Sequence, residues 1–231
     1  MDPEAGRKAV WRKNCMDMDR RESLQQAAWM DYILIIVNVL AFLIGFAGSA
    51  NGLKAGMYSA GALYAPLLFK GQGYYRLLTS VFLHADLSHL FNNMIVQFAG
   101  GGIVERNIGH IKYGILYLLC GIGGNIASAA MDYLSGQYGF SVGASGAVFG
   151  VIGALVYMVL REAKHMRDNG LKPDRMKSLV IRTGLMTIYL LYSGWVNPVV
   201  NQAAHVGGLI LGFVLASVMM PNRQIDLGGL F

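Results

Sequence analysis

The sequence predicts an all-α integral membrane protein built from six transmembrane helices. Hydrophobic residues make up 55% of its 231 residues and charged residues only 14%, whereas about 25% of residues are charged in an average soluble domain. Several stretches without Asp, Glu, Lys or Arg approach or exceed the ~20 residues that a helix needs to cross a bilayer. Many of the 30 glycines lie inside these stretches, which is typical of membrane helices that pack closely.

The charge-free stretches assign the helices in order. The first three helices follow directly from single stretches. The stretch from Tyr133 to Leu160 opens with glycine and polar residues at 135–139, which predict a loop before the fourth helix. The longest stretch, from Thr183 to Asn222, divides at Asn197-Pro198 because proline and the residue before it disfavour helix. The predicted helices lie near residues 30–50, 87–105, 112–132, 145–161, 179–196 and 203–220.

The distribution of Lys and Arg gives an independent check on the number of helices. Six lie before the first helix, two between the second and third, seven between the fourth and fifth, and one after the sixth, so that 16 of the 19 fall on one side. The opposite side carries only Lys54, Lys70 and Arg76. Because loops rich in Lys and Arg stay in the cytoplasm, we expect both termini to be cytoplasmic.

This topology divides the chain into a basic cytoplasmic leader (1–29), a six-helix core (30–220) and a short cytoplasmic tail (221–231). A cleaved secretory signal is the alternative reading of the first helix, but the leader is long for one. The outer loop 51–75 contains an apolar stretch, 63–69, that is too short to span and is expected to lie in the membrane interface.

Polar residues gather at the starts of the second, fourth and sixth helices. These helices run in the same direction, so their starts share a depth near the outer face. The starts hold His89 and Asn93, Ser145, and His205, and a polar residue within a span indicates a functional site. A fourth helix ending at residue 161 would be only about 25 Å long, which would place Ser145 below the outer surface.

Small residues predict how the fourth and sixth helices meet. Gly146 and Gly150 in one, and Ala204 and Gly208 in the other, are spaced by four positions, a pattern that permits close approach of two backbones. Packing along these faces would bring Ser145 near His205, as nucleophilic catalysis requires. Phe149, one turn after Ser145, could then stack on the imidazole. Residues 183–222 contain no Asp or Glu to supply a third member, so a dyad is the simplest interpretation.

Structural interpretations remain open for each of these residues. An intramembrane serine often bonds back to a carbonyl one turn earlier, and a histidine often bridges two helices. His89 and Asn93 share a helix face and could donate hydrogen bonds to a developing oxyanion, or could make a polar contact between helices. His84 and His89 are five positions apart, on different faces of a helix, and no His-Glu-x-x-His occurs, so a zinc protease site is not expected. We also expect no cofactor.

Taken together and in order, the motifs resemble the rhomboid family of intramembrane serine proteases. The similarity extends from about Trp29 to Met220. Its motifs are Tyr75-Arg76, His84 with His89 and Asn93, Gly101-Gly102-Ile103-Val104-Glu105-Arg106, Gly143-Ala144-Ser145-Gly146, and Ala204-His205 followed by Gly208 and Gly212. Tyr75 stands where tryptophan is frequent in the family, and Phe149 where tyrosine sometimes occurs, and neither difference affects the dyad.

The resemblance implies a six-helix rhomboid-like bundle with Ser145 as nucleophile and His205 as general base. It also implies an oxyanion hole made by His89, Asn93 and the Ser145 backbone N–H, and a fifth helix that gates lateral entry. The expected activity is a serine endopeptidase that cleaves transmembrane segments of membrane proteins in the lipid bilayer. A non-proteolytic chaperone or binding protein on the same fold is the alternative. A small-solute transporter is disfavoured because no inverted repeat is apparent.

The expected partners are transmembrane protein substrates and lipid. Nucleic acid is not expected, because the basic residues belong to separate loops and not to one face. A bacterial plasma membrane is favoured because the sequence shows no transit peptide, seventh span or large soluble domain. The sequence does not indicate an oligomeric state.

Overall fold

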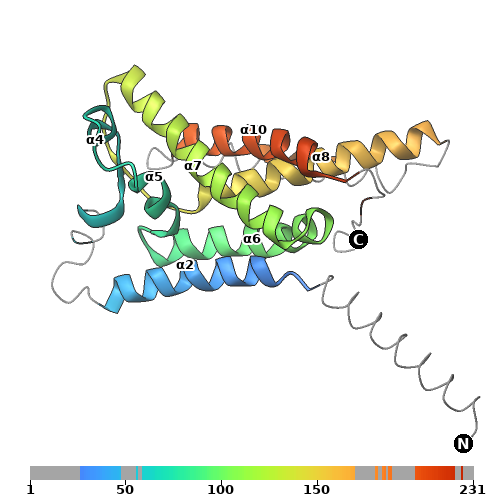
Figure 1. The fold of residues 1–231 in the computed structure, drawn as a ribbon, viewed down its shortest axis with the longest axis horizontal. Helices are drawn as coiled ribbons and strands as arrows, with labels where there is room; N and C mark the ends of the chain where they lie inside the picture. Colours follow the sequence, from blue (N-terminus) through green and yellow to red (C-terminus); the bar gives the residue numbers. More distant parts are fainter. Residues whose placement is uncertain are drawn as a thin grey trace, which may run out of the picture.

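The computed structural model describes residues 27–47, 56, 59–169, 180–181, 184–185, 187–188, 201–221 and 225. In this part of the chain, long helices form most of the structure (Figure 1). They are α2 (Trp29–Ala47), α6 (Leu87–Ile108), α7 (His110–Ser135), α8 (Ser145–Asp168) and α10 (Gln202–Met219).

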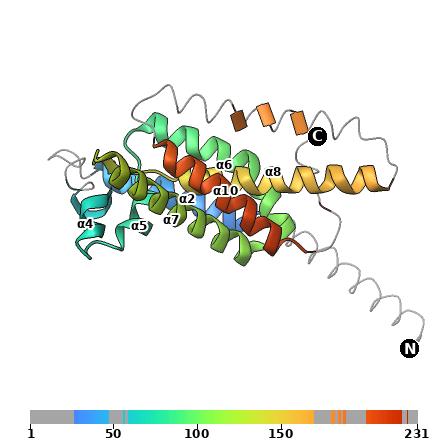
Figure 2. The same ribbon diagram turned by 90° about the horizontal axis from the view of Figure 1, so that it is seen from above.

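The described long helices run in two opposite directions. Helices α6, α8 and α10 run one way, and α2 and α7 run the other way (Figures 1 and 2). Helix α10 packs most extensively on α8 and also along α7, and α2 packs on α6. Two hydrogen bonds mark a common end of the bundle: Lys112 Nζ donates to the Met219 carbonyl at 3.3 Å, and Arg161 Nη2 donates to the Pro221 carbonyl at 2.8 Å.

Four of the described helices are long and apolar enough to cross a membrane, namely α2, α7, α8 and α10. Helix α6 has 22 residues, which is sufficient length, but it carries polar side chains such as Gln97 and Glu105 that are buried against its neighbours. The predicted helix at 179–196 lies outside the described residues except for six positions, which are helical. Six helices therefore remain a prediction. Most of the leader and tail also lie outside the described residues.

Helix α8 is longer than the sequence predicts, because it continues to Asp168. The expected end at residue 161 marked the first charge, whereas Arg, Glu, Ala and Lys are all strong helix formers. At 24 residues the helix is about 36 Å long. Its length alone therefore does not place Ser145 below a membrane surface.

Short elements form within the expected outer loop and directly after it. Residues 63–69 form strand β1 (Leu63–Tyr64) and helix α4 (Ala65–Phe69). They are followed by α5 (Arg76–Thr79) and the 3-10 helix η2 (Ser80–Phe82). Strand β1 pairs antiparallel with β2 (Phe140–Ser141), with Leu63 opposite Ser141. The outer loop is thereby attached to the segment that leads into α8.

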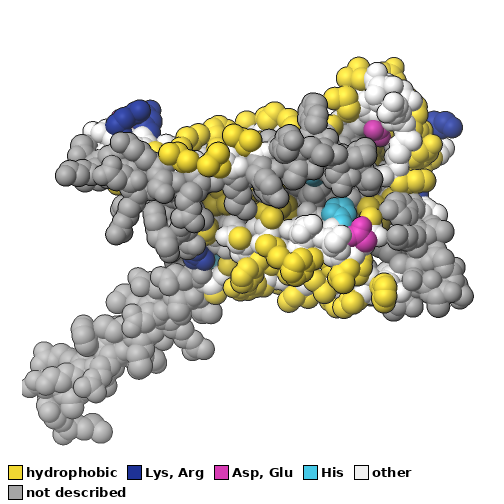
Figure 3. Space-filling model, turned by 180° about the vertical axis from the view of Figure 1, so that it is seen from behind, with side chains coloured by type: hydrophobic (Ala, Val, Ile, Leu, Met, Phe, Trp, Pro, Cys, Tyr) yellow, Lys and Arg dark blue, Asp and Glu magenta, His cyan; other side chains and the backbone are white. Residues whose placement is uncertain are grey.

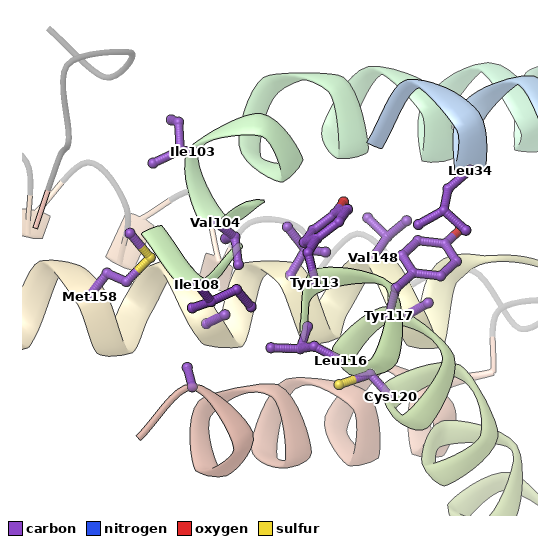
Figure 4. Packing of buried hydrophobic residues seen from close by; sticks show 14 of the residues in the cluster. Leu34, Ile103, Val104, Ile108, Tyr113, Leu116, Tyr117, Cys120, Val148 and Met158 are labelled. Carbon is purple, nitrogen blue, oxygen red and sulfur yellow. The ribbon is translucent and has the colours of Figure 1, made fainter. Parts of the chain in front are cut away.

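The buried core lies between α2, α6, α7 and α8. Tyr113, Tyr117 and Leu116 of α7 are fully buried and pack with Val148 and other apolar residues (Figure 4). Many large apolar side chains face outward instead, including Leu134 and Val218, each 79% exposed. Figure 3 shows apolar side chains over much of the described part of the face that it draws. Such a surface suits lipid and not water.

Candidate functional site

Helix α6 begins with a capping aspartate that orients its first turn. Asp86 has an extended backbone, and its Oδ1 accepts hydrogen bonds from the His89 backbone N–H at 2.8 Å and from the Ser88 hydroxyl at 2.6 Å. The Ser88 bond, followed by the His89 bond, holds the pKa of the Asp86 carboxyl below its usual value. An ionised cap of this kind stabilises a helix N-terminus, and here it fixes the backbone of a predicted site residue.

Glycines hold α8 and α10 in backbone contact, as their spacing predicts. A Cβ atom added to Gly208 would overlap the Gly146 carbonyl, and one added to Gly212 would overlap the Gly150 carbonyl. A glycine of α7 completes the arrangement, since a Cβ on Gly124 would lie 2.8 Å from the Ala204 carbonyl. We call this backbone contact between α8 and α10 the glycine seam. Residues next to Ser145 and His205 therefore lie in contact with the neighbouring helices.

His205 lies one turn into α10, and Ser145 is the first residue of α8. The buried His205 ring stacks on Phe149, with ring centroids 4.2 Å apart and an interplanar angle of 15°. The predicted stacking is confirmed. In the part of the chain that is described, no hydrogen bond joins the Ser145 hydroxyl to the imidazole, so helix packing and ring stacking alone bring the two positions together.

His89 and Asn93 face the backbone that leads into Ser145. A Cβ on Gly143 would lie 2.6 Å from His89 Cε1 and 3.8 Å from Asn93 Nδ2. Gly143 also has φ of +130°, a conformation that glycine adopts far more readily than other residues. Both the backbone angle and the space therefore require glycine two residues before Ser145. The structure thus brings His89 and Asn93 to one side of the same short segment.

We call His84, His89, Asn93, Ser145 and His205 the helix-start cluster. Among the described residues, four buried polar atoms of this cluster have no hydrogen-bond partner: both ring nitrogens of His84, Asn93 Nδ2 and His205 Nδ1. Buried polar groups are normally paired. A concentration of unpaired ones indicates groups that are available to a bound molecule or to water.

The sequence interpretation of His84 is wrong. It placed His84 and His89 on different faces of one helix, but their rings contact each other edge to face, with centroids 5.2 Å apart. His84 lies before α6, outside the helix, so helical periodicity does not apply to it. Among the described residues, no group of three or more His, Cys, Asp or Glu side chains could hold a metal ion.

Sequence reasoning missed the residues that support this cluster. The Ser80 carbonyl accepts a hydrogen bond from the Gly143 N–H at 2.9 Å. Asn125 of α7 in turn donates to Ser80 Oγ at 2.9 Å and to the Leu77 carbonyl at 2.8 Å. An asparagine within an apolar stretch was the one signal that could have drawn attention to Asn125. Buried Arg76, known only as part of a motif, donates to the Ala62 carbonyl at 2.8 Å.

Comparison with known proteins identifies the family. Residues 71–222 match the Rhomboid domain. The chain is 34% identical to Rhomboid-like protease 1 of Toxoplasma gondii over 72% of its length and 53% of that protein. It is 32% identical to Rhomboid protease GluP of Bacillus subtilis over 81% of its length and 34% of that protein. RHOMBOID-like protein 6, mitochondrial, of Arabidopsis thaliana is 33% identical over 71% of this chain and 50% of its own length.

The chain thus spans about half, or less, of the length of these three relatives. The match covers α6, α7, α8 and α10, and hence the whole helix-start cluster. With several helices able to cross a membrane, the chain is a multi-pass membrane protein and belongs to the rhomboid family.

Proposed function

We propose that this protein is an intramembrane serine endopeptidase that uses Ser145 and His205 as a catalytic dyad. The stacking of His205 on Phe149, one turn after Ser145, is the observation that carries the proposal. The glycine contacts between α8 and α10 support it, because they allow the two helices to approach closely beside Ser145 and His205. Two of the relatives carry the word protease in their names.

The proposed reaction begins when the neutral His205 imidazole takes the proton of the Ser145 hydroxyl. The Ser145 oxygen attacks the carbonyl carbon of a peptide bond, and the resulting oxyanion accepts hydrogen bonds from His89, Asn93 and the Ser145 N–H. His205 then gives its proton to the departing amine, which leaves an ester on Ser145. Water, activated by the same imidazole, hydrolyses the ester and restores the hydroxyl.

The proposed substrates are transmembrane segments of other membrane proteins. All peptide groups of such a helix are hydrogen-bonded internally, so a substrate must unwind locally before a carbonyl can reach Ser145. The unpaired polar atoms of the helix-start cluster suit an extended peptide, because they could bind backbone groups that unwinding exposes. We place the protein in a bacterial plasma membrane with both termini cytoplasmic and the cluster toward the outer face.

Cleavage by purified protein in liposomes tests this function. A labelled single-span substrate is incubated with the wild type, with Ser145→Ala and with Ser217→Ala. Ser217 is an exposed serine of α10 that bonds back to the Val214 carbonyl at 2.7 Å, so it is a matched control. We expect Ser145→Ala to lose cleavage by at least about a thousandfold and Ser217→Ala to keep it. Equal cleavage by the wild type and Ser145→Ala would refute the proposal, and binding without cleavage would favour the chaperone alternative.

A further inference from the structure

Asn201 lies directly before α10, four residues from His205. Its Oδ1 accepts a hydrogen bond from the Ala204 N–H at 3.1 Å, so it is the N-cap of that helix. Its carbonyl also accepts from the His205 N–H at 3.3 Å. Both the side chain and the backbone of Asn201 therefore fix the turn of helix that carries the proposed general base.

The same side chain reaches two other elements. Asn201 Nδ2 donates hydrogen bonds to Ser128 Oγ of α7 and, at 3.2 Å, to Ser141 Oγ of β2. Ser141 lies four residues before Ser145 on the segment that leads into α8. One amide thus connects the start of α10, the C-terminal part of α7 and the approach to the proposed nucleophile.

This connection supplies a constraint that the glycine seam lacks. Glycine contacts allow α8 and α10 to approach closely, but smooth backbone surfaces do not by themselves prevent one helix from sliding along the other. Proton transfer between a serine and a histidine depends on their separation, and a displacement of about 1 Å can cost a hundredfold in rate. Bonds from one capping side chain to both neighbouring elements oppose such sliding.

We infer that Asn201 is a positioning residue that sets the axial register of His205 relative to Ser145. The inference rests on the proposed function of those two residues. A side chain that only capped α10 would not need its amide nitrogen to reach Ser128 and Ser141.

The test separates the cap from the connection to the serines. Asn201→Ser keeps a good N-cap, but its short side chain cannot reach both serines. The double variant Ser128→Ala/Ser141→Ala keeps Asn201 unchanged and removes the two hydroxyl groups that it contacts. The readout is the rate at which a fluorophosphonate probe labels Ser145, measured in liposomes well below the unfolding midpoint. Asn169→Ser is the control, because the described hydrogen bonds of the Asn169 side chain go to His165 at the exposed end of α8.

We expect Asn201→Ser to slow labelling about tenfold or more, with an unfolding midpoint close to that of the wild type. The two serine substitutions together should slow it similarly, and adding Asn201→Ser to them should cause little further loss, because all three remove the same connection. Wild-type labelling by Asn201→Ser, or fully additive losses, would overturn the inference. If Ser145 of the wild type is not labelled at all, the proposed function fails first and the inference fails with it.

Discussion

Two groups of buried polar residues in this protein differ in how their hydrogen bonds are satisfied. We call the first, which lies between α2, α6 and α7, the α2–α6–α7 network; it comprises Asp31, Asn38, Gln97, Glu105, Tyr113 and Tyr117. In it, Tyr113 donates to Asp31 Oδ1 at 2.5 Å, and Gln97 donates to the same oxygen at 3.2 Å. Tyr117 donates to Gln97 Oε1 at 3.1 Å.

The carboxylate of Glu105 completes this network at the start of α2. It accepts hydrogen bonds from the backbone N–H groups of Met30 at 2.9 Å and Asp31 at 2.7 Å, which would otherwise be unpaired at a helix N-terminus. Within the described residues, Asn38 Oδ1 is the exception, since it has no partner. The network therefore uses its polar atoms on one another.

The helix-start cluster does the opposite, because four of its buried polar atoms have no partner among the described residues. Leaving a buried donor or acceptor unpaired costs about 1–3 kcal/mol, and a cluster of such costs is expected where a molecule must be bound. The comparison teaches that buried polarity in this protein has two uses. The polar atoms of the α2–α6–α7 network bond to one another, and those of the helix-start cluster remain open to a bound molecule or to water.

Replacing Asn93 should have the largest effect, because it should lower activity strongly without lowering stability. Asn93→Ala removes a proposed oxyanion donor, so kcat should fall about 100- to 1,000-fold. The free energy of unfolding should not fall, because Asn93 Nδ2 has no partner among the described residues. Cleavage kinetics and denaturant unfolding in detergent measure both quantities. The control is Asn92→Ala, at the neighbouring exposed position. A large loss of stability in Asn93→Ala would contradict the difference between the helix-start cluster and the α2–α6–α7 network.

Widening the glycine seam should damage both properties. Gly208→Ala forces its new methyl group against the Gly146 carbonyl, and overpacking of this kind costs about 1–3 kcal/mol. Activity should fall as well, since α10 must move away from α8. Gly114→Ala is the matched control, because the nearest atom to a new Cβ there is the flexible Met30 side chain at 3.4 Å. Equal unfolding midpoints for Gly208→Ala and Gly114→Ala would contradict a close backbone contact between α8 and α10.

Breaking the α2–α6–α7 network should affect stability alone. Tyr113→Phe removes the hydroxyl that donates to buried Asp31, which should lower the free energy of unfolding by about 1–3 kcal/mol. The kcat of the molecules that remain folded should stay unchanged. Tyr133→Phe, at a position that is 63% exposed, should change neither quantity. A fall in kcat for Tyr113→Phe would show that the two polar groups are coupled.

The Asp86 cap should give the smallest effect, and one that depends on pH. Asp86→Ala should cost about 1 kcal/mol near neutral pH. Because the folded-state pKa of Asp86 is lowered, its contribution to stability is present above the usual pKa of aspartate and is lost as the pH falls through the lowered value. The wild type and Asp86→Ala should therefore converge in acid. Asp86→Asn should lose this pH dependence, because its amide oxygen accepts hydrogen bonds without ionising. A stability difference between the wild type and Asp86→Ala that persists in acid would argue against an ionised cap.

The sequence predicted those parts of the molecule that depend on local pattern. Small residues spaced by four positions predicted the contact of α8 with α10, and with it the neighbourhood of Ser145 and His205. The stretches without charge located the described long helices to within a few residues, except at the end of α8. That end was missed because freedom from charge measures the ability to cross a bilayer and not the ability to form a helix.

The contact of α8 with α10 was predicted, but the individual hydrogen-bond partners in distant segments could not be predicted. The pairing of Leu63 with Ser141, and the bonds from Asn201 to Ser128 and Ser141, join positions at least 60 residues apart. No periodicity specifies such partners, because they depend on how several helices pack together. The contact of His84 with His89 was missed for a related reason, since the chain turns between them and does not continue as a helix.

The central claim is that Ser145 and His205 act together, and covalent labelling tests it most directly. Protein in liposomes is treated with a fluorophosphonate probe, and the modified residue is located by mass spectrometry in the wild type and in His205→Ala. The account predicts that the probe modifies Ser145 in the wild type and that labelling falls to background in His205→Ala, while both proteins remain folded at the labelling temperature. Absence of label on Ser145, or equal labelling rates in the two proteins, would contradict it.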